Sequence, residues 1–145
     1  MALNDLNDFL RGKTLTRGGL CYGSIIYFAF DGGAVETSGG AWSLEIGGKP
    51  VETSETVSDS HALNALLGKS IRGVRVLFPL ACVLDFWDGS QLRCEDCSHA
   101  DYGMGKELLN VYRDDPHGTP WICELYAPLG DFSWRTANQP VSASY

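Results

Sequence analysis

The feature that most constrains this chain is an internal duplication. The segment Leu10-Arg11-Gly12-Lys13-Thr14-Leu15 returns 56 residues later as Leu66-Leu67-Gly68-Lys69-Ser70-Ile71. A second block, Phe30-Asp31-Gly32, returns as Trp87-Asp88-Gly89 at an offset of 57, which we assign to one extra residue in the connecting strands of the second copy. Two copies are too few for a solenoid or a propeller, which need at least three repeats. The duplication therefore predicts two similar halves that share one core.

Both copies show the same order of local signals. A short helix ends at Gly12 or Gly68, because glycine readily adopts the left-handed backbone that ends a helix. Two strands rich in β-branched and aromatic residues follow, and an Asp-Gly dipeptide then marks a tight hairpin turn. The expected strands are 14–20, 24–30 and 34–37 in the first copy, and 70–78, 80–87 and 91–94 in the second.

Beyond the third strand the two copies diverge. Alternation of apolar and polar residues predicts a half-buried strand over 42–46, whereas the polar segment 47–60 is expected to be an exposed loop. Segment 106–112 fits either a strand or a helix, 121–126 predicts a final strand, and 136–145 is a polar tail that we expect to fray. The predicted fold class is mainly β (α+β): one domain over residues 1–145, with repeats at about 4–46 and 60–112. It contains two antiparallel meanders with short helices, packed as a sandwich or half-barrel.

The charge balance limits the partners. The chain carries 18 acidic and 11 basic side chains, a net charge of −7. This argues against nucleic acid as a partner, because phosphate binding needs a basic face. The sequence has no secretory signal and no apolar run of membrane-spanning length, so we expect a cytoplasmic protein without a membrane role. Unpaired strand edges would allow a homodimer.

The five cysteines are an odd number, which argues against a disulfide framework in a chain without an export signal. Cys21, Cys82 and Cys123 lie among apolar residues and are expected to be buried thiols.

Two motifs suggest ligand chemistry. Gly-Lys-Thr and Gly-Lys-Ser resemble the end of a phosphate-binding loop, but the required earlier glycine is absent and the order of strand and helix is reversed. Cys94, Cys97 and His99 are the most concentrated metal ligands, and zinc would need a fourth ligand such as His117 or Cys123. The acidic residues between the two cysteines would raise the pKa of both thiols. A small metal-binding regulatory module is therefore the alternative function; otherwise we expect no metal and no cofactor.

No recognisable catalytic constellation is present, so we expect no enzymatic activity. A third alternative is a small enzyme or ligand carrier with a pocket between the meanders.

Acidic residues cluster in the second half of the chain, with aromatic residues nearby. Acidic patches speed association with a basic partner, and aromatic residues inside an acidic rim are good interface anchors. The candidate contact residues are Asp85, Asp88, Glu95, Asp96, Asp101, Tyr102, Asp114, Asp115 and Trp121.

The pattern Leu-x-Gly-Lys-x-(Leu/Ile), two aliphatic strands and (Phe/Trp)-Asp-Gly-x-x-(Leu/Val) resembles small bacterial immunity-type proteins. These are cytosolic antidotes encoded beside polymorphic or contact-dependent toxins. The resemblance covers residues 10–42 and 66–102, about half of the chain. It implies a protein without catalytic activity that binds and occludes one cognate toxin domain, and the acid excess suits a basic toxin.

Overall fold

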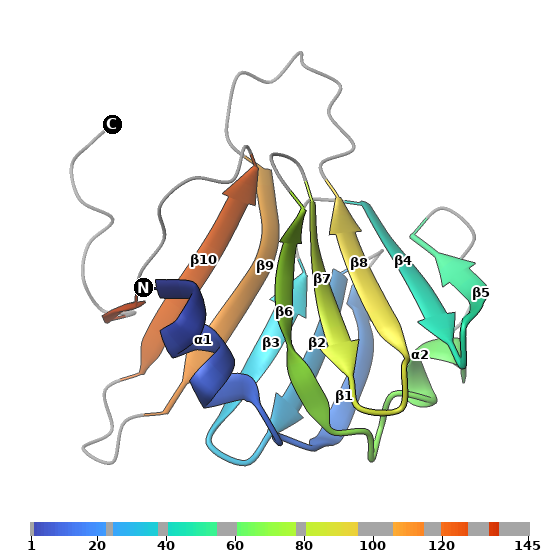
Figure 1. Cartoon of the computed structure of the whole chain (residues 1–145), viewed down its shortest axis with the longest axis horizontal. Coiled ribbons are helices and arrows are strands. Elements are labelled where there is room, and N and C mark those ends of the chain that lie inside the picture. The colour runs from blue at the N-terminus through green and yellow to red at the C-terminus, as the bar shows by residue number, and fades with distance from the viewer. Residues whose placement is uncertain are drawn as a thin grey trace.

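The computed structural model describes residues 2–22, 25–37, 41–54, 61–77, 81–95, 106–114, 120–127 and 134–136. Two antiparallel sheets face each other (Figure 1). In spatial order, one contains β1 (Leu15–Tyr22), β2 (Ile25–Phe30), β3 (Gly33–Thr37), β9 (Lys106–Arg113), β10 (Trp121–Ala127) and β11 (Trp134–Thr136). The other contains β5 (Lys49–Thr53), β4 (Ala41–Ile46), β8 (Gln91–Glu95), β7 (Ala81–Phe86) and β6 (Ile71–Leu77). The mainly β prediction is confirmed, and the packing is that of a sandwich rather than a closed barrel.

The two halves of the chain exchange strands between the sheets. The strands β1, β2 and β3 form a meander in the six-stranded sheet, and β6, β7 and β8 form the same meander in the five-stranded sheet. The strand after each meander crosses to the opposite sheet, so that β4 pairs with β8 and β9 pairs with β3. Each half therefore completes its sheet with a strand from the other half.

The repeated Gly-Lys-Thr/Ser segments meet where β1 and β6 begin. The hydroxyls of Thr14 and Ser70, which hold equivalent places in the two copies, hydrogen bond at 2.8 Å. Two pairs of equivalent backbone hydrogen bonds surround these hydroxyls. In the first pair, the N–H groups of Gly12 and Gly68 donate to the carbonyls of Ile71 and Leu15, both at 2.8 Å. In the second pair, the N–H groups of Ile71 and Leu15 donate to the carbonyls of Lys13 and Lys69, at 2.8 and 3.0 Å. This reciprocity places a pseudo-twofold axis at the pair. The segment therefore ends a helix and joins the two sheets.

The extra residue of the second copy lies in a hairpin turn, not in the connecting strands where we placed it. Strand pairing keeps the offset of 56 as far as Phe30 and Phe86. The offset is 57 at Ala34 and Gln91, in the third strands. The turn between β7 and β8 is thus one residue longer than its counterpart. It carries Trp87, whose side chain is 57% exposed.

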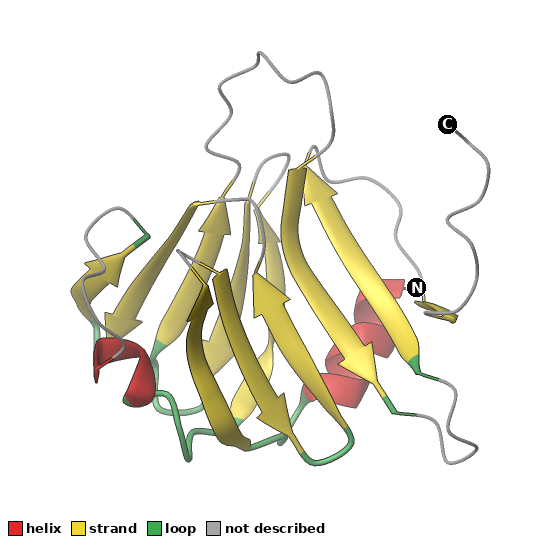
Figure 2. Cartoon of the chain, turned by 180° about the vertical axis from the view of Figure 1, so that it is seen from behind, coloured by secondary structure: helices red, strands yellow, loops and turns green. Residues whose placement is uncertain are grey.

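The helices α1 (Ala2–Leu10) and α2 (His61–Asn64) lie at opposite sides of the sandwich (Figures 1 and 2). Each packs against the first strand of the other half, α1 against β6 and α2 against β1. Apolar residues of both helical segments are fully buried in the core between the sheets: Leu6, Leu10, Leu63 and Leu66. Among the described residues, no helix combines the length and the apolar character needed to cross a membrane.

Two segments differ from the sequence-based expectation. The expected loop 47–60 contains a strand, β5, which pairs with β4 and is largely exposed. The expected tail contributes Thr136 to β11, and residues 137–145 lie outside the described part. Both strands are held by backbone pairing at a sheet edge, so their side chains show little alternation. The ambiguous segment 106–112 is strand β9.

One side chain fastens α1 to the edge strand β6. The amide of Asn7 accepts a hydrogen bond from the Val74 N–H at 2.6 Å and donates one to the Val74 carbonyl at 3.2 Å. We expect Asn7→Ala to lower the free energy of unfolding by about 2 kcal/mol, because both backbone groups lose their partner in a partly buried place. Urea denaturation measures this. Asn4→Ala, an exposed position of the same helix, is the control and should stay within about 0.5 kcal/mol of the parent. Equal stability of the two variants would contradict this role.

Candidate functional site

The structure spreads the predicted contact residues over both sheets. Asp85 and Glu95 lie at opposite ends of the β7–β8 ladder, and Asp88 lies in the turn between these strands. On the other sheet, Asp114 directly follows β9 and Trp121 is the first residue of β10. The remaining four, Asp96, Asp101, Tyr102 and Asp115, lie outside the described residues. The described members therefore do not form one continuous patch.

Three predicted contact acids on the five-stranded sheet, Asp85, Asp88 and Glu95, are each paired with a cation. Asp85 holds the Arg75 guanidinium through two hydrogen bonds, 2.5 Å to Nε and 3.0 Å to Nη2. Glu95 pairs with Arg93 on its own strand. Such pairs are partly exposed and contribute little stability, but they compensate the carboxylate charges locally.

Asp88, in the turn between β7 and β8, has two partners. It pairs with Lys69 and also accepts a hydrogen bond from the Ser90 N–H at 2.9 Å. These contacts, the lysine first, lower the pKa of Asp88 to about 2. Its carboxylate therefore stays charged at neutral pH. Because Lys69 and the Ser90 N–H already bind this carboxylate, it stabilises the turn and is not an uncompensated charge for a partner protein.

The three cysteines whose side chains the structure describes lie in the core. Cys82 and Cys123 are buried as predicted, whereas the side chain of Cys21 is outside the described residues. Cys94 lies directly opposite Cys82 and is buried as well. A hydrogen bond with Cys82 and burial raise the pKa of the Cys94 thiol. Of the metal candidates, Cys97 and His99 are outside the described residues, and no group of three potential metal ligands occurs within the described ranges.

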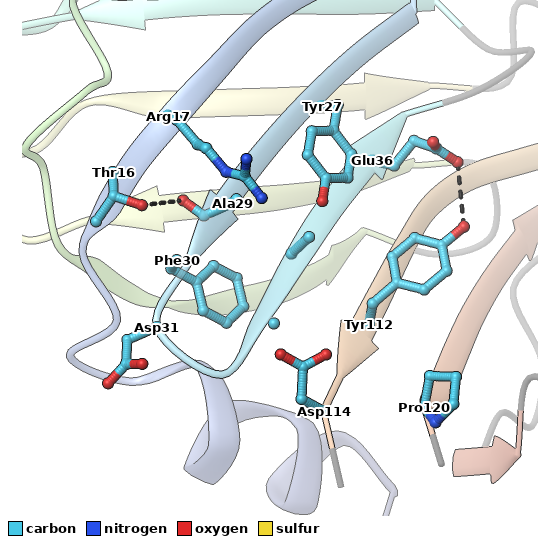
Figure 3. Close-up of a pocket in the computed structure, with 12 residues that line it drawn as sticks. Thr16, Arg17, Tyr27, Ala29, Phe30, Asp31, Glu36, Tyr112, Asp114 and Pro120 are labelled. Carbon is cyan, nitrogen blue, oxygen red and sulfur yellow. Dashed lines mark hydrogen bonds between the residues drawn. The ribbon is translucent and has the colours of Figure 1, made fainter. Parts of the chain in front are cut away.

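A hollow of about 620 Å³ lies on the outer face of the six-stranded sheet (Figure 3). Its lining comes from β1, β2, β3, the end of β9 and Pro120. Tyr27 and Tyr112 form two sides, and the guanidinium of Arg17 extends beside Tyr27. Below, this surface is called the acid–tyrosine hollow. It lies outside the sandwich, unlike the pocket between the meanders that we considered.

Small side chains form the floor of the acid–tyrosine hollow. Ala29, Ala34 and Tyr112 follow one another across β2, β3 and β9 in a single row of the ladder. Because residues opposite each other in an antiparallel sheet share a face, the two alanines leave space beside the tyrosine. Both alanines are buried although they point away from the core.

The charges around the acid–tyrosine hollow are mostly negative. Of the described residues, Asp31, Glu36 and Asp114 line it together with one cationic residue, Arg17. The Tyr112 hydroxyl donates a hydrogen bond to Glu36 at 3.3 Å, which links β9 to β3 across the outer face. The hollow thus combines phenol rings, three carboxylates and one guanidinium.

Sequence reasoning found Asp114 but missed Tyr27, Asp31 and Glu36 as site residues. A usable signal exists in β2, where Tyr27 alternates with the core residues Ile26 and Phe28. The alternation places Tyr27 on the outward face of the strand, and aromatic residues are enriched at protein interfaces. Trp121 has a different place, because it shares a sheet face with the buried Cys123 rather than with Asp114.

The fold and this geometry define a two-sheet β-sandwich domain with a polar, aromatic hollow on the outer face of one sheet. No protein family, curated protein or solved structure matches the chain.

Proposed function

We propose that this chain is a cytoplasmic immunity-type protein of a bacterial toxin system, which binds one basic toxin domain and occludes it without catalysis. The observation that supports this most is the acid–tyrosine hollow. Tyrosines in a concave site are favourable anchors for a protein partner, because each buries a large area with little loss of side-chain entropy. The sequence resemblance to immunity-type proteins points in the same direction.

The charges support a basic partner. The described residues that line the hollow include three acids and one arginine, so together they carry a net negative charge. A negative surface speeds encounter with a positive one and disfavours acidic partners. The predicted contact acids of the five-stranded sheet, Asp85, Asp88 and Glu95, are paired with cations and contribute less. We therefore propose that a lysine or arginine of the toxin enters between Tyr27 and Tyr112, where the rings and Glu36 receive its charge.

The first experiment identifies the partner. The tagged chain is purified from its native host at moderate salt, and a stoichiometric co-purifying protein is expressed alone and together with the chain. The proposal expects toxicity of the partner alone and growth when both are present. A partner that is harmless alone would contradict the immunity function.

Variants then test the surface. Tyr27→Ala should weaken partner binding by about 30-fold, the effect of a 2 kcal/mol anchor. The double change Asp31→Asn and Asp114→Asn should slow association by about tenfold at low salt, with a smaller effect at high salt. Binding kinetics with the purified partner measure both. Glu45→Gln removes a carboxylate from the other sheet and serves as control. If Glu45→Gln weakens binding and Tyr27→Ala does not, the acid–tyrosine hollow is not the interface.

A further inference from the structure

A second hollow, of about 510 Å³, lies on the five-stranded sheet beside the end of α1. Within the described part of the chain, its lining includes three arginines, Arg11, Arg72 and Arg75, and one acidic residue, Asp85. In a chain of net charge −7, this place has a local excess of positive charge. We call it the arginine hollow. It lies on a different sheet from the acid–tyrosine hollow.

Two of the three arginines are held in place by carboxylates. Arg75 is fixed by a two-point contact with Asp85, whose two carboxylate oxygens accept hydrogen bonds from Nε at 2.5 Å and from Nη2 at 3.0 Å. Arg11 contacts Asp8 of its own helix at 3.2 Å, with both side chains largely exposed. Such an exposed pair is weak and exchanges easily for another anion.

Arg72 is the residue that makes this hollow unusual. The register of β6 shifts between Ile71 and Gly73, so Arg72 is the additional residue of a β-bulge. Bulges redirect side chains and are frequent beside functional sites. Within the described residues Arg72 forms no ion pair with a carboxylate; its guanidinium lies 5.3 Å from the ring centre of Trp87.

The partner ring comes from the inserted turn residue. Trp87 occupies the turn that is one residue longer in the second copy, and it is largely exposed instead of packing in the core. A guanidinium stacked on an aromatic face is held in orientation while its N–H groups, which lie in the plane of the group, can still donate to an anion. The bulge and the lengthened turn together present an oriented arginine to solvent.

We infer that the arginine hollow binds an oxyanion, either a phosphate group or a carboxylate, with Arg72 as its principal ligand. The planar fork of a guanidinium matches the oxygens of both groups. Arg75, oriented by Asp85, and Arg11 surround the same space, and the Gln91 side chain adds a neutral polar group to the lining. The inference does not depend on the toxin partner, because it concerns the other sheet.

The test titrates the purified full chain with inorganic phosphate and, separately, with citrate, using calorimetry and tryptophan fluorescence. We expect saturable binding of at least one anion, and at least tenfold weaker binding to Arg72→Gln. Arg72→Lys should restore only part of the affinity, because lysine keeps the charge but not the fork. In Trp87→Phe the fluorescence response should be lost while calorimetry still detects binding.

Arg93→Gln is the matched control, because Arg93 lies on the same sheet outside the hollow and pairs with Glu95. Its affinity should equal that of the parent. Binding of phosphate alone would identify a phosphate ligand, and binding of citrate alone a carboxylate ligand. The inference is overturned if neither anion binds saturably at millimolar concentration, or if Arg93→Gln weakens binding as much as Arg72→Gln in variants that keep the parent circular dichroism spectrum.

Discussion

Trp42→Ala should lower the free energy of unfolding by about 3–5 kcal/mol, the range for a fully buried aromatic residue cut back to alanine. Trp42 lies on β4, the strand that the first half contributes to the other sheet, and its side chain is 2% exposed. It is among the largest fully buried side chains. Because domains are stable by only about 5–15 kcal/mol, this single change removes a large share of the total.

Urea denaturation followed by circular dichroism measures this loss. Trp87→Ala is the control for removal of the same side chain from an exposed place and should cost about 1 kcal/mol or less. Trp42→Phe, which keeps most of the ring volume, should lie between the two and remain measurable if Trp42→Ala does not fold. A similar loss for Trp42→Ala and Trp87→Ala would contradict the central place of Trp42.

The strands of the repeat were predictable because their signals are local. Alternation, β-branched residues and the Asp-Gly turn placed β1 to β4 and β6 to β8 within a few residues. The exchange of β4 and β9 between the sheets was not predictable, because it pairs residues far apart in sequence, such as Ala34 with Tyr112. Edge strand β5 was missed because exposed residues such as Val51, 48% exposed, follow no core pattern.

The same limitation explains the candidate site. The floor of the acid–tyrosine hollow exists because Ala29 and Ala34 meet Tyr112 across three strands, which the sequence alone does not order. The clustering of acids along the chain predicted one surface. However, strands that are consecutive in sequence, such as β8 and β9, lie in different sheets, and several of the acids form ion pairs with arginine or lysine. The sequence pattern therefore included Asp114 among the candidate contact residues, whereas only the pairing of the strands shows that Glu36 and Tyr27 line the same hollow.

Gly33→Ala should destabilise the protein by about 3 kcal/mol, because β3 and β9 approach each other there without room for a side chain. A Cβ at Gly33 would lie 2.1 Å from the backbone oxygen of Tyr112 and 3.0 Å from the Phe30 ring. Because both the Tyr112 backbone and the buried Phe30 ring would have to move, removing this steric clash is costly. The change also acts on the candidate site, because the β3–β9 pairing holds Glu36 beside Tyr112.

Gly48→Ala separates this crowding from backbone strain. Gly48 lies in the β4–β5 turn with a φ of +81°, and a Cβ there would meet nothing within 4 Å. Alanine at this position should cost about 1–2 kcal/mol through the left-handed backbone alone, and it should leave partner binding unchanged. Gly33→Ala should lose more stability and also bind the partner more weakly. Equal losses in stability with unchanged partner binding would contradict this prediction. They would mean that a change in the β3–β9 pairing does not disturb the acid–tyrosine hollow.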